Sequence, residues 1–457
     1  MLDRFNIEKI FKILFSNGGD YADIFFENKN TCNIVFENGK IEKVQSGNDS
    51  GIGIRLLHDN KTFYGFTTEF TDKSLIEIAQ KLSEFTKSSK SDYTLSLFKS
   101  SAILAENIIL PEKVSLQQKI DKVLEGKYFL EKYSSKIVQF KIVYSDSIQE
   151  VEIINSNGNF IKDLRPQILF LSHVIAAKDE LIQTGYEAQG GALGFEFFNN
   201  NVVEETCKLA ADRAVNNLTA KKIKGGTMPV VLSSNAGGTM IHEAIGHGLE
   251  ADIVNDGMSV YTKDKIGKKV ASEKITVIDD GTIPFKRGTQ IYDDEGNRCQ
   301  KNILVEKGIL KNYIYDVLNA LKDGAKPTGN GRRESFRFKP IPRMTNTYIA
   351  PGKEEPLQII RSVDKGIFVK KMGGGQVNTT TGDFVFEVTE GYEIVNGEIG
   401  DRVRDTTLIG NGPEILNKID MVGTDLGFSI GTCGKDGQGV PVSDAQPTLR
   451  IPEIVVG

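Results

Sequence analysis

The chain has 457 residues, of which 39% are hydrophobic and 26% are charged. The composition is that of a globular protein. A chain of this length is too long to fold around one ordinary hydrophobic core, so two or three folded domains are expected. A net charge of -5 argues against broad binding to nucleic acid, and no apolar run reaches the ~18 residues needed to span a bilayer.

Cysteine usage indicates a reducing compartment. The four cysteines form no C-x-x-C pair and lie far apart, which fits free thiols better than a disulfide framework. The N-terminus carries an acid at Asp3 and is not followed by the apolar segment of a signal peptide. We therefore expect a cytoplasmic protein.

The first part of the chain mixes helices and strands. Residues 1–17 have a helical spacing of apolar side chains, and Asn38-Gly39 predicts a tight hairpin. The predicted strands are Ala22–Glu27, Cys32–Glu37, Ile41–Val44, Ile52–Leu57, Val138–Ser145, Val151–Asn155 and Ile168–Ala176. Further helices are predicted at 73–88, 116–132 and 202–219. These elements predict an N-terminal α/β domain over residues 1–220.

The composition changes at Lys221–Gly226, a short basic stretch with glycines. We interpret it as a solvated linker rather than a nucleic-acid contact. Beyond it, Pro229–Leu232 has the pattern of a strand, and the remaining short strands are separated by glycine turns. This pattern predicts a β-rich, barrel- or sandwich-like C-terminal domain over residues 221–457. The expected fold class is α+β.

Residues 242–247 read His-Glu-Ala-Ile-Gly-His and are typical of a metal site. Imidazole is the commonest metal ligand in proteins, and a neighbouring carboxylate can serve as a general base. On an ideal helix, however, residues five apart point about 140° away from each other. His242 and His247 can share one ion only if the helix is deformed, and Gly246 and Gly248 make a π-bulge sterically cheap.

Two histidines do not complete a metal site, because a catalytic zinc usually has three protein ligands. The alternative to a metal site is two surface histidines on an amphipathic helix. Candidates for the third ligand are His58, His173, Glu250, Asp252 and Cys433. Cys433 lies between glycines in what reads as a flexible loop, where a free cysteine is unusual. The alternative for Cys433 is a small residue at a turn.

Four blocks in the same order resemble the TldD branch of the TldD/PmbA family, whose members are known as modulators of DNA gyrase and as zinc peptidases. The blocks are HEAIGHGLEAD at 242–252, PTGNGRRESFRFKPIPRMTNTYIAPG at 327–352, GGGQV at 373–377 and GTCGKDGQG at 431–439. The resemblance covers essentially the full chain and is strongest over 225–450. Residues 253–269 match the family pattern less well.

The resemblance implies a zinc ion held by His242, His247 and Cys433, with Glu243 as the catalytic carboxylate. It also implies an N-terminal α/β domain, a β-rich C-terminal domain and a PmbA-type (TldE) subunit as partner in a heterodimer, with a homodimer as the alternative. No nucleic-acid or membrane partner is expected.

The first functional hypothesis is therefore a zinc-dependent metallopeptidase that acts on peptides or unfolded protein segments. A metal-activated water would attack the scissile carbonyl, with Glu243 as general base. The hydrolysis of another amide is the alternative within enzymes. The alternative from another class is a non-catalytic interaction protein that modulates a gyrase-linked regulator or toxin.

Three further motifs have weaker interpretations. Arg332 and Arg333 could hold a substrate carboxylate or form structural salt bridges. The GGGQV segment at 373–377 could let a peptide backbone approach closely or could form a strained turn. The glycine-rich stretch 185–191 reads as a mobile loop.

Overall fold

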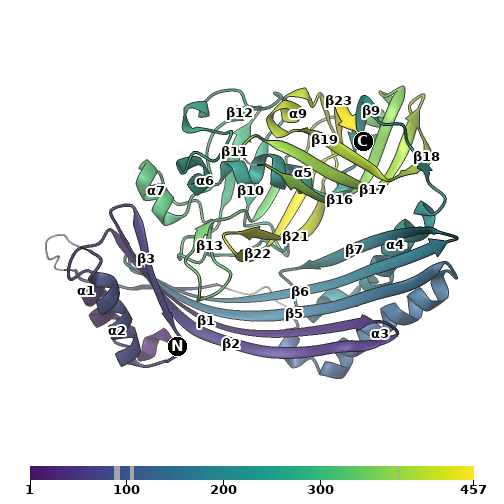
Figure 1. The fold of residues 1–457 in the computed structure, drawn as a ribbon. Coiled ribbons are helices and arrows are strands. Elements are labelled where there is room, and N and C mark those ends of the chain that lie inside the picture. The colour runs from purple at the N-terminus through teal and green to yellow at the C-terminus, as the bar shows by residue number, and fades with distance from the viewer. Residues whose placement is uncertain (87–92, 103–107, 379) are drawn as a thin grey trace.

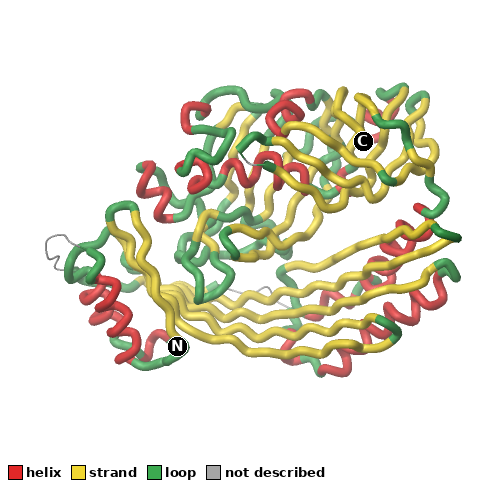
Figure 2. Tube along the Cα trace, viewed as in Figure 1, coloured by secondary structure: helices red, strands yellow, loops and turns green. Residues whose placement is uncertain are grey.

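The structure, a computed structural model, describes residues 1–86, 93–102, 108–378 and 380–457. It is a mixed α+β fold in which a long, curved sheet lies beneath a β-rich C-terminal part (Figure 1). Strands predominate over helices along the whole chain, as Figure 2 shows. The fold class expected from the sequence is confirmed.

The curved sheet is built from seven strands with the order β3-β2-β1-β5-β6-β4, and β7 pairs with β6. Its strands are β1 (Tyr21–Glu37), β2 (Lys40–His58), β3 (Lys61–Thr67), β4 (Phe98–Ser101), β5 (Ile137–Asn155), β6 (Asn159–Lys178) and β7 (Leu181–Gly191). The accompanying helices are η1 (Leu2–Arg4), α1 (Ile7–Leu14), α2 (Asp72–Ser83), η2 (Pro111–Lys113), α3 (Leu116–Tyr133), η3 (Phe195–Asn199) and α4 (Val202–Asn217).

The strands of this sheet are longer than the sequence predicts. The two strands predicted between 22 and 37 form the single strand β1, and those predicted between 138 and 155 form β5. The polar residues in the middle of β1 still pair with β2 on one side and β5 on the other, so the ladder continues through them. Stretch 185–191, expected to be a loop, is the second half of strand β7.

The sheet buries apolar side chains on both faces because successive residues of a strand point to opposite sides. Ile24 and Phe26 of β1 pack with α1 and α2, whereas Phe25 packs against Phe336 of the C-terminal part. Farther along the sheet, α3 and α4 cover a second apolar cluster. One face therefore carries the helices, and the other receives the C-terminal part.

The C-terminal part contains two larger sheets. The strands of the first are β8 (Lys221–Lys222), β9 (Gly226–Leu232), β16 (Lys365–Val377), β17 (Asp383–Val395), β18 (Glu398–Arg404), β19 (Thr406–Asn411), β20 (Met421–Val422) and β23 (Leu449–Val456). The strands of the second are β10 (Val277–Asp280), β11 (Lys301–Glu306), β12 (Ile309–Leu310), β15 (Asn346–Ile349), β21 (Gly427–Lys435) and β22 (Gln438–Gln446). Strands β13 (Gly331–Arg332) and β14 (Ile341–Pro342) form a small hairpin.

In the first of these sheets, pairing of β16 with both β9 and β17 closes a barrel-like ring of strands. The helical elements of this part are η4 (Ser234–Ala236), α5 (Thr239–Ile241), η5 (His242–Gly246), η6 (His247–Leu249), α6 (Ala251–Asn255), η7 (Lys263–Lys265), α7 (Val317–Asp323), α8 (Pro356–Arg361) and α9 (Gly412–Lys418). The helix that carries the histidines contributes Met240, Ile241, Ile245 and Leu249 to the core shared by both sheets. No helix among the described residues is long and apolar enough to cross a membrane.

Candidate metal centre

The two motif histidines lie on a helix that is locally wound as a π-helix. After α5, residues His242–Gly246 form η5, and the His247 N–H donates to the His242 carbonyl five residues back. The extra residue in this turn brings both imidazoles to the same side, with ring centroids 4.9 Å apart. The deformation predicted from the spacing of the motif is present, and it ends at Gly246.

Cys433 lies on a strand rather than in the expected flexible loop. It belongs to β21, which pairs with β22 in a regular antiparallel hairpin closed at Asp436-Gly437. The thiol is 3% exposed. The glycines around Cys433 suggest a loop in the sequence, but the strand pairing continues through Gly431 and Gly434 up to the turn at Asp436-Gly437. Buried Arg343 donates a hydrogen bond to the Cys433 carbonyl and helps to fix this strand.

The cluster itself consists of His242, His247 and Cys433. The Cys433 Sγ lies 3.1 Å from His242 Nε2 and 3.4 Å from His247 Nε2. All the potential ligand atoms lie within 4.8 Å of one another. A tetrahedral zinc with ordinary bond lengths separates a nitrogen ligand from a sulfur ligand by about 3.5 Å. The side chains therefore have the donor types and the spacing that a zinc ion requires.

Each imidazole is hydrogen-bonded through its Nδ1 to a carboxylate. His242 Nδ1 lies 2.7 Å from Asp444 Oδ1, and His247 Nδ1 lies 2.8 Å from Glu250 Oε2. Because an ionised carboxylate only accepts hydrogen bonds, each Nδ1 carries a proton, and each Nε2, which lies toward Cys433, is the nitrogen left to bind a metal ion once it has lost its own proton. This is the arrangement in which proteins orient metal-binding histidines. Glu250, a candidate third ligand in the sequence, thus orients a histidine instead.

Lys435 links the two halves of the cluster. Its ammonium group donates to Glu250 and to Asp252, at 3.1 and 2.7 Å. Lys435 lies two residues after Cys433 on the hairpin, whereas the two acids follow the histidine helix. Asp252, the other acidic candidate, is therefore paired with a lysine. The remaining histidines, His58 and His173, lie in the curved sheet and are not part of the cluster.

The electrostatics of the cluster favour a thiolate beside two cations. Burial favours the neutral thiol, but hydrogen bonds with His242 and His247 outweigh it and lower the pKa of Cys433 to about 5. Burial also opposes the charge on His247, yet Glu250 and Cys433 raise the pKa of its imidazole to about 9. Anionic groups thus surround the position where the three ligand atoms converge, which favours any cation that occupies it.

Glu243 faces the same cavity without a partner of its own. The cavity has a volume of about 370 Å³ and is lined by His242, Glu243, His247 and Cys433 together with parts of β7, β16 and β21. Among the described residues, none forms a hydrogen bond or ion pair with the Glu243 carboxylate. Sequence adjacency to His242 places this carboxylate beside the cluster, while the orienting acids come from elsewhere.

Two edge strands border this cavity. β21 is the last strand of its sheet, and β16 pairs with β9 only as far as Val369, so its following residues have a free edge. Gly373 and Gly374 lie in that part of β16 and line the cavity, and a Cβ added at Gly374 would meet no atom within 4 Å. The GGGQV segment is thus an irregular strand, not a turn.

The two arginines of the GNGRR segment have structural partners. Arg332 donates to the carbonyls of Met344 and Pro441, and Arg333 pairs with Asp23 and the Asp294 carbonyl. Both are almost fully buried. Both have the contacts of structural arginines: Arg332 fixes segments within the C-terminal part, and Arg333 joins that part to the curved sheet through Asp23.

Comparison with known proteins identifies the family. Residues 22–84, 109–218 and 225–457 match domain 1, the central domain and the C-terminal domain of the PmbA/TldA metallopeptidases. The metalloprotease TldD homolog of Buchnera aphidicola (subsp. Acyrthosiphon pisum) is 39% identical over 449 residues, covering 96% of this chain and 92% of that protein. The chain belongs to the TldD/PmbA metallopeptidase family. Its relatives of 35–39% identity include TldD homologues.

Other members extend this relationship in sequence and in fold. The zinc metalloprotease TldD homolog of Saccharolobus solfataricus is 27% identical, covering 96% of this chain and 97% of that protein. The fold matches a candidate modulator of DNA gyrase from Thermotoga maritima, with a TM-score of 0.80, 22% identity and coverage of 99% and 100%. It also matches TldE from Thermococcus kodakarensis, with a TM-score of 0.77, 18% identity and coverage of 99% of both chains. These two solved structures show the fold, whereas the metalloprotease names of the relatives in sequence support a peptidase role at the level of the family.

Proposed function

We propose that this TldD/PmbA family member is a zinc-dependent metallopeptidase that hydrolyses peptides or unfolded protein segments. In this proposal His242, His247 and Cys433 hold the ion, and Glu243 is the general base. The observation that carries the proposal is the orientation of the two imidazoles, each held by a carboxylate with its Nε2 toward the Cys433 thiol. Thiolate and imidazole ligands favour zinc over hard cations such as magnesium, and the name of the Saccharolobus relative agrees with zinc.

When bound, zinc would supply a Lewis acid that lowers the pKa of a coordinated water and polarises the scissile carbonyl. The carboxylate of Glu243 would accept a proton from the attacking water and later donate it to the leaving amine. This carboxylate is suited to the task because it lines the cavity and is not engaged by another described side chain. Asp444 and Glu250 would hold the imidazoles in place throughout.

The edges of β16 and β21 support an extended peptide as substrate. Main-chain groups on a free strand edge can pair with any peptide backbone, and they give affinity without demanding a particular side chain. The open space at Gly374 would allow such a backbone to approach closely. Unfolded segments suit these edges because they can become extended and have unpaired main-chain groups along their whole length.

The family resemblance further leads us to propose a PmbA-type (TldE) subunit as partner, with a homodimer as the alternative. The likeness of this fold to TldE supports a partner of the same architecture. We propose a cytoplasmic location and a division near residue 221 between the N-terminal α/β domain and the C-terminal domain.

Substitution of Glu243 by Gln tests the general-base assignment. The variant should retain zinc and lose peptidase activity on an unfolded protein substrate by about 100-fold or more, because the amide cannot take a proton. Elemental analysis of the zinc content per chain shows whether an inactive variant has lost only the base or has also lost the ion. Full activity with zinc still bound would show that another group is the base.

Metal content of His247→Ala and Cys433→Ala tests the ligand set independently. Each variant should lose most of its zinc, because a site with two ligands binds far more weakly than one with three. His173→Ala, which alters a histidine of the curved sheet, is the matched control and should keep its zinc. A wild-type chain that takes up no zinc when zinc is supplied, and that has no peptidase activity, would instead favour the interaction-protein alternative.

A further inference from the structure

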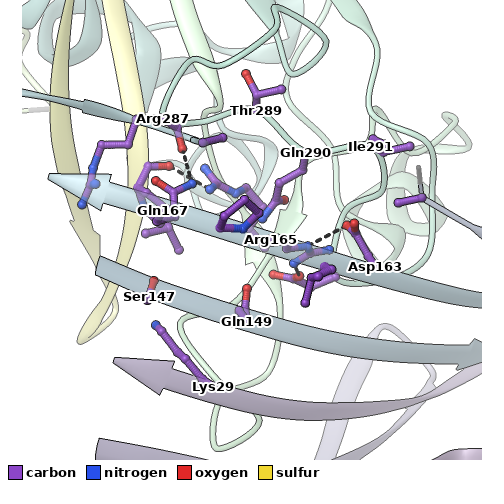
Figure 3. Close-up of a pocket in the computed structure, with 18 of the residues that line it drawn as sticks. Lys29, Ser147, Gln149, Asp163, Arg165, Gln167, Arg287, Thr289, Gln290 and Ile291 are labelled. Carbon is purple, nitrogen blue, oxygen red and sulfur yellow. Dashed lines mark hydrogen bonds and ion pairs between the residues drawn. The ribbon is translucent and has the colours of Figure 1, made fainter. Parts of the chain in front are cut away.

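A second cavity, with a volume of about 640 Å³, lies between the curved sheet and the C-terminal part (Figure 3). Lys29, Gln149 and Gln167 reach it from β1, β5 and β6, and residues 282–291 close it from the other side. Thr432 of β21 lines both this cavity and the one that contains the metal cluster. The two cavities therefore adjoin at the strand that carries Cys433.

Arg287 stands where the two cavities adjoin. Its backbone N–H donates to Ser443 Oγ, its carbonyl accepts from Gln167, and its Nε donates to the Gly431 carbonyl of β21 at 3.2 Å. These three anchors fix the guanidinium against β21. They leave both terminal nitrogens without a hydrogen-bond partner among the described residues.

No described carboxylate pairs with Arg287. Burial lowers the pKa of its guanidinium, and no carboxylate in the described parts of the chain offsets this effect. Arg165, on the other side of the same cavity, is different because Asp163 and Asp294 both pair with it. In Figure 3 the Arg287 side chain extends away from Arg165 and its partner Asp163. A half-buried guanidinium that is held in place but lacks an anion is suited to bind one.

Other groups in the second cavity also lack partners. The Oε1 atoms of Gln167 and Gln290 are buried and accept no hydrogen bond within the described parts of the chain. Buried acceptors without a donor are costly, and the N–H groups of a bound peptide would satisfy them. The ammonium group of Lys29 forms no ion pair with any residue that the structure describes. The cavity thus offers cations for a carboxylate and acceptors for a peptide backbone.

The position of Arg287 relates this anion site to the cluster. Gly431 is two residues from Cys433, which is about 7 Å along a strand. A carboxylate on the Arg287 guanidinium would lie on the order of 10 Å from the thiol, the span of about three residues of an extended peptide. One peptide could therefore reach both the cluster and Arg287.

We propose that Arg287 forms a carboxylate-binding subsite that selects peptides with a carboxylate a few residues from the scissile bond. This inference rests on the proposed peptidase function and deepens it. The carboxylate can come from an acidic side chain or from the C-terminus of the peptide, since the guanidinium recognises both in the same way.

The test measures peptide binding and cleavage separately. Fluorescently labelled peptides are titrated into the zinc-loaded Glu243→Gln chain, which binds without cleaving, and the same peptides are then cleaved by the chain with Glu243 intact. In a first set of peptide pairs, the two members carry Glu or Gln at one position, and each pair tests a different position. The members of a second pair have the same sequence and differ only in a free or an amidated C-terminus. Arg287→Gln is compared with Arg361→Gln, which removes an exposed arginine that lacks an ion pair in the described chain.

Peptides with the carboxylate should bind about 10- to 100-fold more tightly than their neutral counterparts, the range expected for charge-assisted hydrogen bonds. Arg287→Gln should abolish this preference and leave the neutral peptides unchanged, and Arg361→Gln should preserve it. The pair of peptides that shows the preference identifies the source of the carboxylate. Equal binding of acidic and neutral peptides, or no binding at all, would overturn the subsite. If peptides with the carboxylate bind more tightly but the chain with Glu243 intact does not cleave them, the subsite is retained and the peptidase proposal is contradicted.

Discussion

At the scale of single residues, the cluster shows why two histidines at an awkward spacing can be buried together. Each imidazole is satisfied at Nδ1 by a carboxylate and directed at Nε2 toward a thiol. The free-energy cost of burying these polar groups is therefore offset by their hydrogen bonds and by attraction between opposite charges. The same arrangement leaves the region between Nε2 and Sγ suited to a cation.

The thiolate character of Cys433 leads to the first prediction. Because its pKa is about 5, the zinc-free protein should present a thiolate over the whole range from pH 6.5 to 8.5. Alkylation of Cys433 by iodoacetamide should then change little with pH, whereas the rate for an ordinary thiol rises almost tenfold per pH unit below its pKa. Mass spectrometry of the modified peptide gives the rate. Cys207, whose pKa burial raises to about 12, provides the internal comparison.

A steep rise in the Cys433 alkylation rate with pH would contradict this assignment. Zinc should also protect Cys433 from alkylation, and Cys207 should be unaffected by zinc. Equal protection of both cysteines would indicate a general change in exposure rather than ligation.

Asp444 leads to a second prediction. Asp444→Asn keeps the size of the side chain but removes the charge that holds the His242 ring, so zinc affinity should fall about 10- to 100-fold. Competition with a chromophoric chelator measures this affinity. Asp264→Asn, which alters an exposed acid paired only with its neighbours, should leave it unchanged. Unchanged affinity in Asp444→Asn would mean that this carboxylate does not support the site.

The side chains that lie together in the cluster could be named from the sequence, but most residues that orient them could not. His242, Glu243 and His247 form a local pattern, and the family resemblance pointed to Cys433. Asp444 is distant in the chain, and a pattern of local spacing carries no information about such a partner. The one available indication was its position: it follows Val440 and Val442 at alternate places of a buried strand, where another apolar residue would be expected.

At the scale of elements, the π-turn is the feature on which the cluster depends. Gly246 allows it, because a Cβ at this position would lie 2.2 Å from the Met344 Sδ. The spacing of the histidines predicted this deformation because only one extra residue per turn can align them. Strand lengths were predicted less well, since the polar residues at 28–30 suggested an end to β1 although both neighbouring strands continue to pair with them.

Gly246→Ala should therefore destabilise the protein by about 1–3 kcal/mol, because the added methyl group overpacks against Met344. Urea denaturation with and without zinc measures the loss and shows whether zinc affinity falls with it. Gly47→Ala, where the nearest atom is 3.6 Å from the added Cβ, is the matched control. If shortening Met344 in Gly246→Ala fails to restore stability, the steric explanation is wrong.

At the scale of the whole molecule, a buried network of charges joins the curved sheet to the C-terminal part. Arg55 of β2 binds Asp23 of β1 and Glu295 beyond β10, and Arg333 binds Asp23 from the other side. All four side chains are fully excluded from solvent. This network could not be predicted from the sequence, because its members are up to 310 residues apart.

Arg55→Met should cost about 3–5 kcal/mol of folding stability, because it leaves Asp23 and Glu295 buried with less compensating charge. Chemical denaturation followed by tyrosine fluorescence measures the loss. Lys73→Met, which removes only an exposed pair with Glu77, should have an effect below about 1 kcal/mol. A similarly small effect of Arg55→Met would show that the network does not hold the two parts together.

The order in which the cluster residues occur along the chain has a consequence for synthesis of the protein. His242 and His247 leave the ribosome long before Cys433, which lies on the hairpin next to the last strand, β23. A nascent chain that lacks this hairpin has both imidazoles but neither the thiol nor Asp444. The complete set of side chains thus exists only after the hairpin that carries Cys433 has been synthesised. A growing polypeptide therefore lacks the full cluster for as long as the segments between His247 and Cys433 are still being made.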